Sequence, residues 1–200
     1  MKNSRSQKII DLVSEKGIIR PRDLKQLGIP ETYLYRLVGS GDIVRIARGL
    51  YTTPGFTFSE HESLAEVCKR VPHGVICLLS ALNFHNLTTQ LPFQVWMAIH
   101  HKTRSPKIDI VPVRIIRMSG ASLDEGIEVH KVDKVPVNVF GPAKTVVDCF
   151  KYRNKVGLDV ALEALRDCWQ KRQCTMDELW RFAKICRVTE VIRPYLESLV

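Results

Sequence analysis

Residues 18–51, IIRPRDLKQLGIPETYLYRLVGSGDIVRIARGLY, decide the fold of the first part of this chain. Two leucines three positions apart predict a short helix over residues 22–27. Gly28 suits the end of that helix, because glycine adopts left-handed backbone angles at little cost. Pro30 suits the first turn of a second helix, where its missing N–H group is not needed. The stretch therefore predicts two short helices joined by a tight turn.

The second helix of this pair is amphipathic. Its apolar positions follow the spacing of one buried face and are Leu34, Leu37 and Val38. Polar and aromatic side chains occupy the opposite face and its flanks, namely Thr32, Tyr33, Tyr35 and Arg36. Gly39 and Gly41 end the helix.

A basic hairpin follows the two helices. Residues 43–46 and 50–52 predict strands on either side of a glycine-containing turn. This order is typical of a winged helix-turn-helix, whose second helix enters the major groove of DNA. Arg45 and Arg48 would then lie on or near the wing and contact phosphates or the adjacent groove. The alternative is a small helical domain whose polar face meets water alone.

The charge of the chain is concentrated on this segment. The formal net charge is +9, and residues 1–56 hold ten Lys and Arg against five Asp and Glu. Such a local excess is the electrostatic footprint of a DNA-binding domain, although charge alone equally suits RNA or an anionic membrane. A further helix over residues 4–15 completes the core, and Lys2, Arg5 and Lys8 either add phosphate contacts or form a solvated basic end.

Composition predicts a cytoplasmic globular protein. Hydrophobic residues make up 45% of the chain, which is enough to build a core, and no apolar run reaches membrane-spanning length. The N-terminus lacks the apolar stretch and cleavage site of a signal peptide. The six cysteines form no C-x-x-C pair, so we expect buried free thiols in a reducing compartment, with no disulfide set and no zinc site.

The rest of the chain predicts a second domain, with its boundary at Pro54-Gly55. Ser59 and Glu62 have the spacing of a capping box for a helix that ends near Arg70. A nearly all-apolar helix is expected over residues 75–87. Valine- and isoleucine-rich stretches then predict a sheet of three to five strands, over residues 93–100, 108–117, 127–132 and 135–140. Four helices follow, over residues 143–152, 158–169, 175–188 and 189–199.

The expected fold class is therefore α+β: an N-terminal winged helix-turn-helix over residues 1–56, then a mixed α/β domain over residues 57–200. That second domain contains a small sheet and C-terminal helices. On the helix over residues 158–169 we expect one buried stripe, made of Leu158, Ala161, Leu162, Leu165 and Trp169.

Templates for catalysis find no match. The sequence has no G-x-S-x-G, no Walker A motif and no G-x-G-x-x-G. Ser80 and His85 would diverge by ~140° on a helix, and His100 and His101 would point to opposite faces of a strand. Asp109 lacks a second carboxylate at strand spacing and suits an edge or exposed position. We therefore expect no catalytic site, no metal and no cofactor.

Three stretches together resemble the AbiEi family of antitoxins. They are QKIIDLVSEKGIIRPRDLKQLGIPETYLYRLVGSGDIVRIARGLY at residues 7–51, LLSALNFHNLTTQLPFQVWMAIH at 78–100 and GPAKTVVDCFKYRNKVGLDVALEALRDCW at 141–169. Their order is more specific than any one of them, and the resemblance covers most of residues 7–170. Residues 171–200 find no counterpart.

The resemblance implies a bacterial antitoxin of a type IV toxin–antitoxin pair linked to phage defence. Such a protein represses its own promoter by binding inverted repeats in double-stranded DNA through the winged helix. It counters a nucleotidyltransferase-like toxin, or acts on that toxin's target, through its C-terminal domain without needing a stable complex. The residues implied for DNA reading are Thr32, Tyr33, Tyr35, Arg36, Arg45 and Arg48. For the antitoxin role the candidate is a basic set around the helical segment, Lys144, Lys151, Arg153 and Lys155; the alternative is a solvated charged helix face.

Two other functions stay open at this point. The first is an ordinary winged-helix transcriptional regulator whose second domain binds a ligand or dimerises. The second is a nuclease guided by the winged helix, for which Asp109 would be essential. A toxin gene next to this one would favour the antitoxin over the first alternative.

Overall fold

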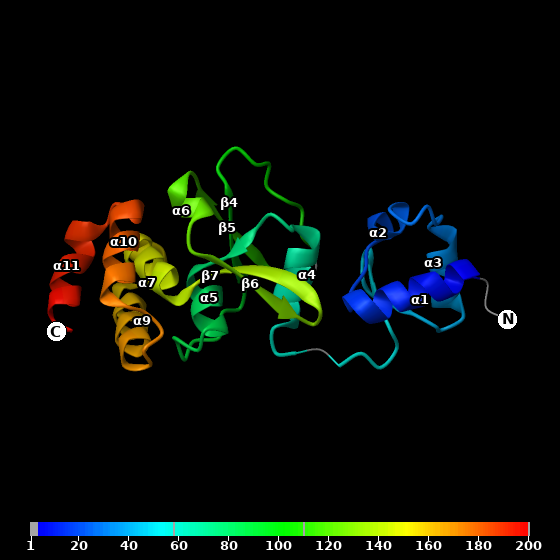
Figure 1. The fold of residues 1–200 in the computed structure, drawn as a ribbon, viewed down its shortest axis with the longest axis horizontal. Coiled ribbons are helices and arrows are strands. Elements are labelled where there is room, and N and C mark those ends of the chain that lie inside the picture. Colours follow the sequence, from blue (N-terminus) through cyan, green and yellow to red (C-terminus); the bar gives the residue numbers. More distant parts are fainter. Residues whose placement is uncertain (1–3, 58, 110, 200) are drawn as a thin grey trace. The chain divides into compact units, whose positions relative to one another are not determined.

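The structure is a computed structural model, and it describes residues 4–57, 59–109 and 111–199. The chain divides into two compact units. Unit 1 contains residues 1–72 together with 131–137, and unit 2 contains residues 73–130 and 138–200. Figure 1 shows the elements of both units along the chain.

Unit 1 begins with a winged helix (Figure 1). Three helices, α1 (Ser4–Lys16), α2 (Pro21–Lys25) and α3 (Thr32–Gly39), precede an antiparallel hairpin of β1 (Val44–Ala47) and β2 (Leu50–Thr52). Ile19 adds a bridge to Tyr51, so the segment before α2 lies beside the hairpin. The core cluster joins the three helices and β2 and contains Ile9, Val13, Ile19, Leu24, Ile29, Leu34, Leu37, Ile43 and Tyr51.

The helix α4 (Glu62–Arg70) also belongs to unit 1. The capping box expected at Ser59 is wrong, because the residue at the N-cap position is His61 and it makes no side-chain cap. Ser59 instead donates its hydroxyl to Asp133 Oδ2 at 3.1 Å, and its backbone N–H donates to Asp133 Oδ1 at 3.0 Å. The carboxylate of Asp133, from a distant segment, therefore accepts the hydrogen bonds of Ser59, which the local pattern had predicted to cap the helix.

Residues 131–137 of unit 1 pack near the end of α1. Lys134 Nζ donates to the carbonyl oxygen of Ser14 at 2.6 Å. Gly17 has a φ of +68°, and a Cβ there would lie 2.2 Å from the carbonyl oxygen of Asp133. This position therefore requires glycine both for its backbone angle and for the close approach of the neighbouring chain.

In the described part of the chain, five strands form the larger sheet in the order β5-β4-β3-β7-β6. They are β3 (Val75–Ile76), β4 (Val95–His100), β5 (Val113–Met118), β6 (Ile127–Val132) and β7 (Val135–Phe140). β4 is antiparallel to β3 and parallel to β5, and β3 is parallel to β7. The helix expected over residues 75–87 is wrong in its first part, since Val75 and Ile76 complete the sheet and α5 spans Leu78–Phe84.

Helices cover the rest of unit 2 (Figure 1). They are α6 (Ala121–Asp124), α7 (Pro142–Lys151), α8 (Arg153–Val156), α9 (Leu158–Gln170), α10 (Met176–Cys186) and α11 (Thr189–Glu197). The short helices α6 and α8 were not predicted. A single core cluster packs α5 and α7 between the sheet and the later helices, with Phe140, Val147, Phe150, Leu165 and Leu179 fully or almost fully buried.

The buried face of α9 differs from its predicted stripe. Its buried residues are Val160, Ala161, Ala164, Leu165 and Cys168. Leu158 is 38% exposed, and Leu162 and Trp169 are half-buried. Ala161 and Leu165 of the predicted stripe are therefore buried, whereas Leu158, Leu162 and Trp169 lie at its border.

The predicted fold class is confirmed. The structure is mixed α+β, with N-terminal helices and a small hairpin, then a sheet, then C-terminal helices.

Candidate nucleic-acid interface

The turn between α2 and α3 has the geometry of a helix-turn-helix. At the start of α2 the backbone N–H of Arg20 donates to Asp23 Oδ2 at 2.9 Å, and Pro21 occupies the first position of the helix. Gly28 has a φ of +62°, which reverses the chain after α2. The backbone N–H of Ile29 donates to the carbonyl oxygen of Leu24 at 3.2 Å. Local hydrogen bonds therefore fix the angle at which α3 begins.

The polar face of α3 is exposed. Thr32 and Arg36 are exposed, and Tyr35 is 57% exposed. Leu34 and Leu37 are buried in the core cluster on the opposite side. Three of the four α3 side chains implied for DNA reading are thus accessible to a partner.

Tyr33 lies between two arginines. It is half-buried and packs against the core cluster. The guanidinium carbon of Arg36 lies 5.5 Å from the centre of its ring, and that of Arg5 on α1 lies 5.8 Å away. Cations at this distance are attracted to the negative face of the ring. Arg5 therefore joins the surface of α3, whereas Lys2 lies outside the described residues.

The hairpin carries its two arginines in different ways. Both Arg45 and Arg48 are exposed. Arg45 Nε donates to the carbonyl oxygen of Ala47 at 3.2 Å, across an irregularity in the strand register. The carbonyl oxygen of Arg48 accepts a hydrogen bond from Arg70 Nη2 of α4. The turn thus has a fixed backbone, and both guanidinium groups remain at the surface.

Tyr51 connects the hairpin to α3. Burial raises the pKa of its phenol, Tyr35 raises it further, and Arg45 lowers it. Tyr35 of α3 and Arg45 of the hairpin thus both act on the pKa of the Tyr51 phenol.

Other basic residues of unit 1 hold the structure together. Arg20 Nη1 donates to the carbonyl oxygens of Lys69 and Arg70 at 2.8 and 3.2 Å. Lys69 Nζ lies 3.1 Å from Asp23 Oδ2. Burial lowers the pKa of Lys69, and Asp23 opposes that shift. Some of the basic residues that make unit 1 positively charged therefore link α2 to α4 and do not belong to the predicted DNA-binding surface.

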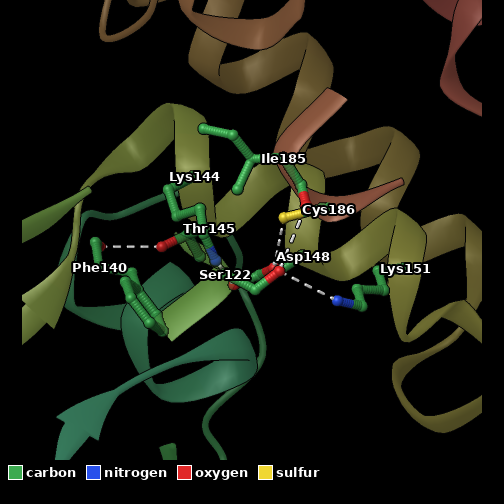
Figure 2. A network of polar contacts seen from close by, with 8 residues as sticks. All are labelled: Ser122, Phe140, Lys144, Thr145, Asp148, Lys151, Ile185 and Cys186. Atoms are coloured by element: carbon green, nitrogen blue, oxygen red, sulfur yellow. Dashed lines mark hydrogen bonds and ion pairs between the residues drawn. The ribbon is translucent and has the colours of Figure 1, made fainter. Parts of the chain in front are cut away.

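The basic set implied for the antitoxin role is not a single surface. Lys144 is fully buried in α7, where its Nζ lies 2.5 Å from Asp148 Oδ2 (Figure 2). Lys151 is half-buried with Nζ 3.4 Å from Ser122 Oγ. Arg153 donates to the carbonyl oxygen of Phe150 at 3.0 Å, and Lys155 is exposed. Lys144 is thus buried away from the other three basic residues. Its partner Asp148, four positions later on α7, was not identified from the sequence.

The buried pair on α7 lies in a polar network (Figure 2). Burial raises the pKa of Asp148, and the neighbouring Lys144 opposes that shift. Cys186 Sγ donates to Asp148 Oδ1 at 3.3 Å. Lys144 Nζ also lies 4.1 Å from the centre of the Phe140 ring. Both charges therefore have partners inside the core.

Among the residues considered for catalysis, Ser80 and His85 bond to different partners. Ser80 Oγ accepts from the Trp96 N–H at 2.9 Å, and His85 Nε2 bonds to the Phe140 carbonyl oxygen at 2.8 Å. The expectation that His100 and His101 point to opposite faces of a strand is wrong, because their ring centres lie 4.4 Å apart; β4 ends at His100, and His101 belongs to the turn that follows. Asp109 is exposed and lies outside any strand. Within residues 4–57, 59–109 and 111–199, no group of three His, Cys, Asp or Glu could hold a metal ion.

Two findings concern the remaining expectations. The six cysteines are free and buried, as predicted: Cys68, Cys77, Cys149, Cys168, Cys174 and Cys186. No helix among the described residues has the length and apolar character needed to cross a membrane.

Comparison with solved structures supports the fold. The chain is similar to the crystal structure of the RV2827C protein from Mycobacterium tuberculosis, with a TM-score of 0.57 and 14% sequence identity. The similarity covers 91% of this chain and 72% of that one. At this identity it shows a shared fold alone. None of the curated proteins compared with the sequence matches it.

Comparison with protein families identifies the N-terminal segment. Residues 7–54 match the AbiEi_4 family, which is described as "Transcriptional regulator, AbiEi antitoxin". The matched segment contains all of α2, α3, β1 and β2 and most of α1. Over residues 7–54, this chain is therefore similar to the AbiEi antitoxin transcriptional regulators, which confirms the inferred resemblance for the first of its three stretches.

Proposed function

We propose that this chain is a DNA-binding antitoxin that represses its own promoter. In this proposal residues 1–56 are the DNA-binding domain and residues 57–200 the antitoxin domain. The observation that carries it is the match of residues 7–54 to the AbiEi regulators, together with the exposed polar face of α3. Winged helices place such a helix in the major groove.

The proposed DNA contacts divide into two kinds. Thr32, Tyr35 and Arg36 on α3 would meet base edges, and Tyr33 would hold Arg36 in position through its ring. Arg45 and Arg48 would contact phosphates beside the groove. Base contacts select the sequence and phosphate contacts fix the register, so variants in the two groups should differ in their effects.

The test of promoter binding is Arg36→Ala in the full chain. Leu34 and Leu37 keep α3 in place, so the fold should be retained. We expect binding to the chain's own promoter to weaken by about 1–3 kcal/mol, measured by fluorescence anisotropy at one fixed salt concentration. Arg166→Ala on α9, an exposed arginine of unit 2, is the matched control. Wild-type promoter affinity in a folded Arg36→Ala protein would remove Arg36 from the interface.

We also propose that the second domain counters a nucleotidyltransferase-like toxin. Lys151, Arg153 and Lys155 remain as its basic set, and Lys144 is excluded because it is buried. The full chain with these three residues changed to glutamine should fail to rescue growth when co-expressed with the neighbouring gene. Arg166→Gln is again the control, and full rescue by the triple variant would rule out this set.

A further inference from the structure

A cavity of about 570 Å³ lies within unit 2. Three segments line it: the end of β5 with the start of α6, the C-terminal end of α7, and the C-terminal end of α10. Figure 2 shows four of the wall residues around the buried pair of α7, namely Ser122, Lys151, Ile185 and Cys186. The proposed function uses Lys151 of this wall in the antitoxin set and gives the cavity itself no role.

The cavity has a positive wall. Arg117, Lys151 and Arg187 line it, and among the described residues its lining includes no aspartate or glutamate. Asp148 lies behind Cys186, but it is already paired with Lys144. Three cations without a lining carboxylate favour an anionic ligand.

Hydrogen-bond donors line the same wall. Lys151 Nζ makes a long bond of 3.4 Å to Ser122 Oγ, which leaves its other N–H groups for a ligand. Burial raises the pKa of the Tyr152 phenol to about 12, so this hydroxyl keeps its proton at neutral pH and can donate. Arg117 already donates to the carbonyl oxygens of His101 and Thr103, and therefore supplies mainly charge.

The cavity also has room for an organic group. Its lining also includes the apolar side chains of Met118, Ala121 and Ile185. Its volume falls in the range of small-molecule sites, about 300–1,000 Å³, and exceeds what a bare inorganic anion fills. The ligand should therefore carry an anionic group and a larger neutral part.

We propose that this cavity binds a small organic phosphate. Its phosphate group would be held by Lys151, Arg187 and Ser122. Its organic part would pack against Met118 and Ile185. The site lies within one unit and needs neither DNA nor a toxin, so it goes beyond the proposed function and can be tested separately from it.

Titration calorimetry on the full chain tests the ligand class. The probes are AMP and glucose 6-phosphate, with adenosine and glucose as matched compounds that lack the phosphate, and inorganic phosphate alone. We expect at least one organic phosphate to bind with a Kd between about 1 µM and 1 mM. Its unphosphorylated partner should bind at least about tenfold more weakly, because hydrogen bonds to a charged group are lost.

The chain offers a matched pair of arginine variants. Arg187 and Arg172 both have a positive φ, of +57° and +54°, and both are exposed. Replacement by glycine relieves the backbone strain at either position, so both variants should fold. Arg187→Gly should weaken binding of the organic phosphate about tenfold or more, and Arg172→Gly, which also removes one charge, should not. Lys151→Gln should weaken it by a similar factor.

Two results would overturn the proposal. One is the failure of both organic phosphates to bind at concentrations up to about 10 mM. The other is binding that Arg187→Gly and Lys151→Gln leave unchanged relative to Arg172→Gly, which would place the ligand elsewhere. Promoter binding by Arg187→Gly should equal that of the wild-type chain in either case, because Arg187 is remote in sequence from residues 7–54 and belongs to unit 2.

Discussion

The pair of Lys144 and Asp148 gives the sharpest test of how the core of unit 2 is stabilised. Both side chains are almost fully buried, at 0% and 1% exposure, with 2.5 Å between Nζ and Oδ2. Changing Lys144 to methionine keeps most of the volume of the side chain and removes its charge. The variant therefore leaves the Asp148 carboxylate in the core with the hydrogen bond from Cys186 Sγ but without its counter-charge.

The expected cost is large compared with the stability of a domain. Removing one member of a buried ion pair typically costs about 3–5 kcal/mol, because the other charge loses its compensation. Ordinary domains have a free energy of unfolding of about 5–15 kcal/mol. Replacing both members by apolar residues is often neutral, so Lys144→Met with Asp148→Leu should recover most of the loss.

The dependence on pH provides the more specific signature. Burial raises the pKa of Asp148 above its ordinary value of 3.8, and Lys144 opposes that shift. Without Lys144 the carboxyl group of the folded state takes up a proton more readily than that of the unfolded state. The free energy of unfolding of Lys144→Met should therefore fall as pH rises above 3.8. In Asp148→Asn the buried ammonium group of Lys144 loses its counter-charge, so that variant should also be destabilised.

Tryptophan fluorescence during urea unfolding is a suitable assay. The three tryptophans, Trp96, Trp169 and Trp180, all lie in unit 2, so the signal follows the unit that contains the pair. Unfolding is measured for the two single variants and the double variant at acid, neutral and alkaline pH. If Lys144→Met lowered the free energy of unfolding by less than about 1 kcal/mol, equally at every pH, the reasoning would be refuted. A buried charge without a partner should destabilise the fold by more than that.

Three other predictions concern separate features. Arg45→Gln and Arg48→Gln should each reduce the slope of log K against log salt for promoter binding by about one, without changing the preference for the promoter over a scrambled duplex. Burial lowers the pKa of His85 below 6.5, so the free energy of unfolding should fall as pH drops through and below 6.5, and His85→Gln should reduce this dependence in urea unfolding. A hydrogen bond with Cys168 lowers the pKa of Cys174, whereas burial raises that of Cys149, so Ellman's reagent should modify Cys174 first and Cys174→Ser should lack this fast phase.

The sequence predicted best those elements whose signals are local. The period of apolar residues located α1, α3, α9 and α10 within a few positions. Thr175 and Glu178 form the capping box at the start of α10, which places the first turn where the sequence expected a helix to open. Such signals depend on neighbours three or four positions away, and the folded chain leaves them intact.

Features that depend on distant segments were missed. β3 is two residues long, and its neighbours β4 and β7 lie far along the chain, so an apolar run looked like part of a helix. Ser59 lost its expected capping role to Asp133. Lys144 was assigned to a surface, although Asp148 four positions later on an otherwise apolar helix face was a usable signal of a buried pair.

The short length of α3 decides how the promoter test can be interpreted. An isolated helix of eight residues is unstable in water, so α3 exists because Leu34 and Leu37 pack into the core cluster. Thr32 and Arg36 are exposed and lie outside the core cluster, and Arg36 lies 5.5 Å from the centre of the Tyr33 ring. Substitutions at these two positions should therefore change the exposed surface of α3 and leave its buried leucines in place. A loss of promoter binding in Arg36→Ala would for this reason report recognition, and an unchanged far-ultraviolet circular dichroism spectrum would separate it from unfolding.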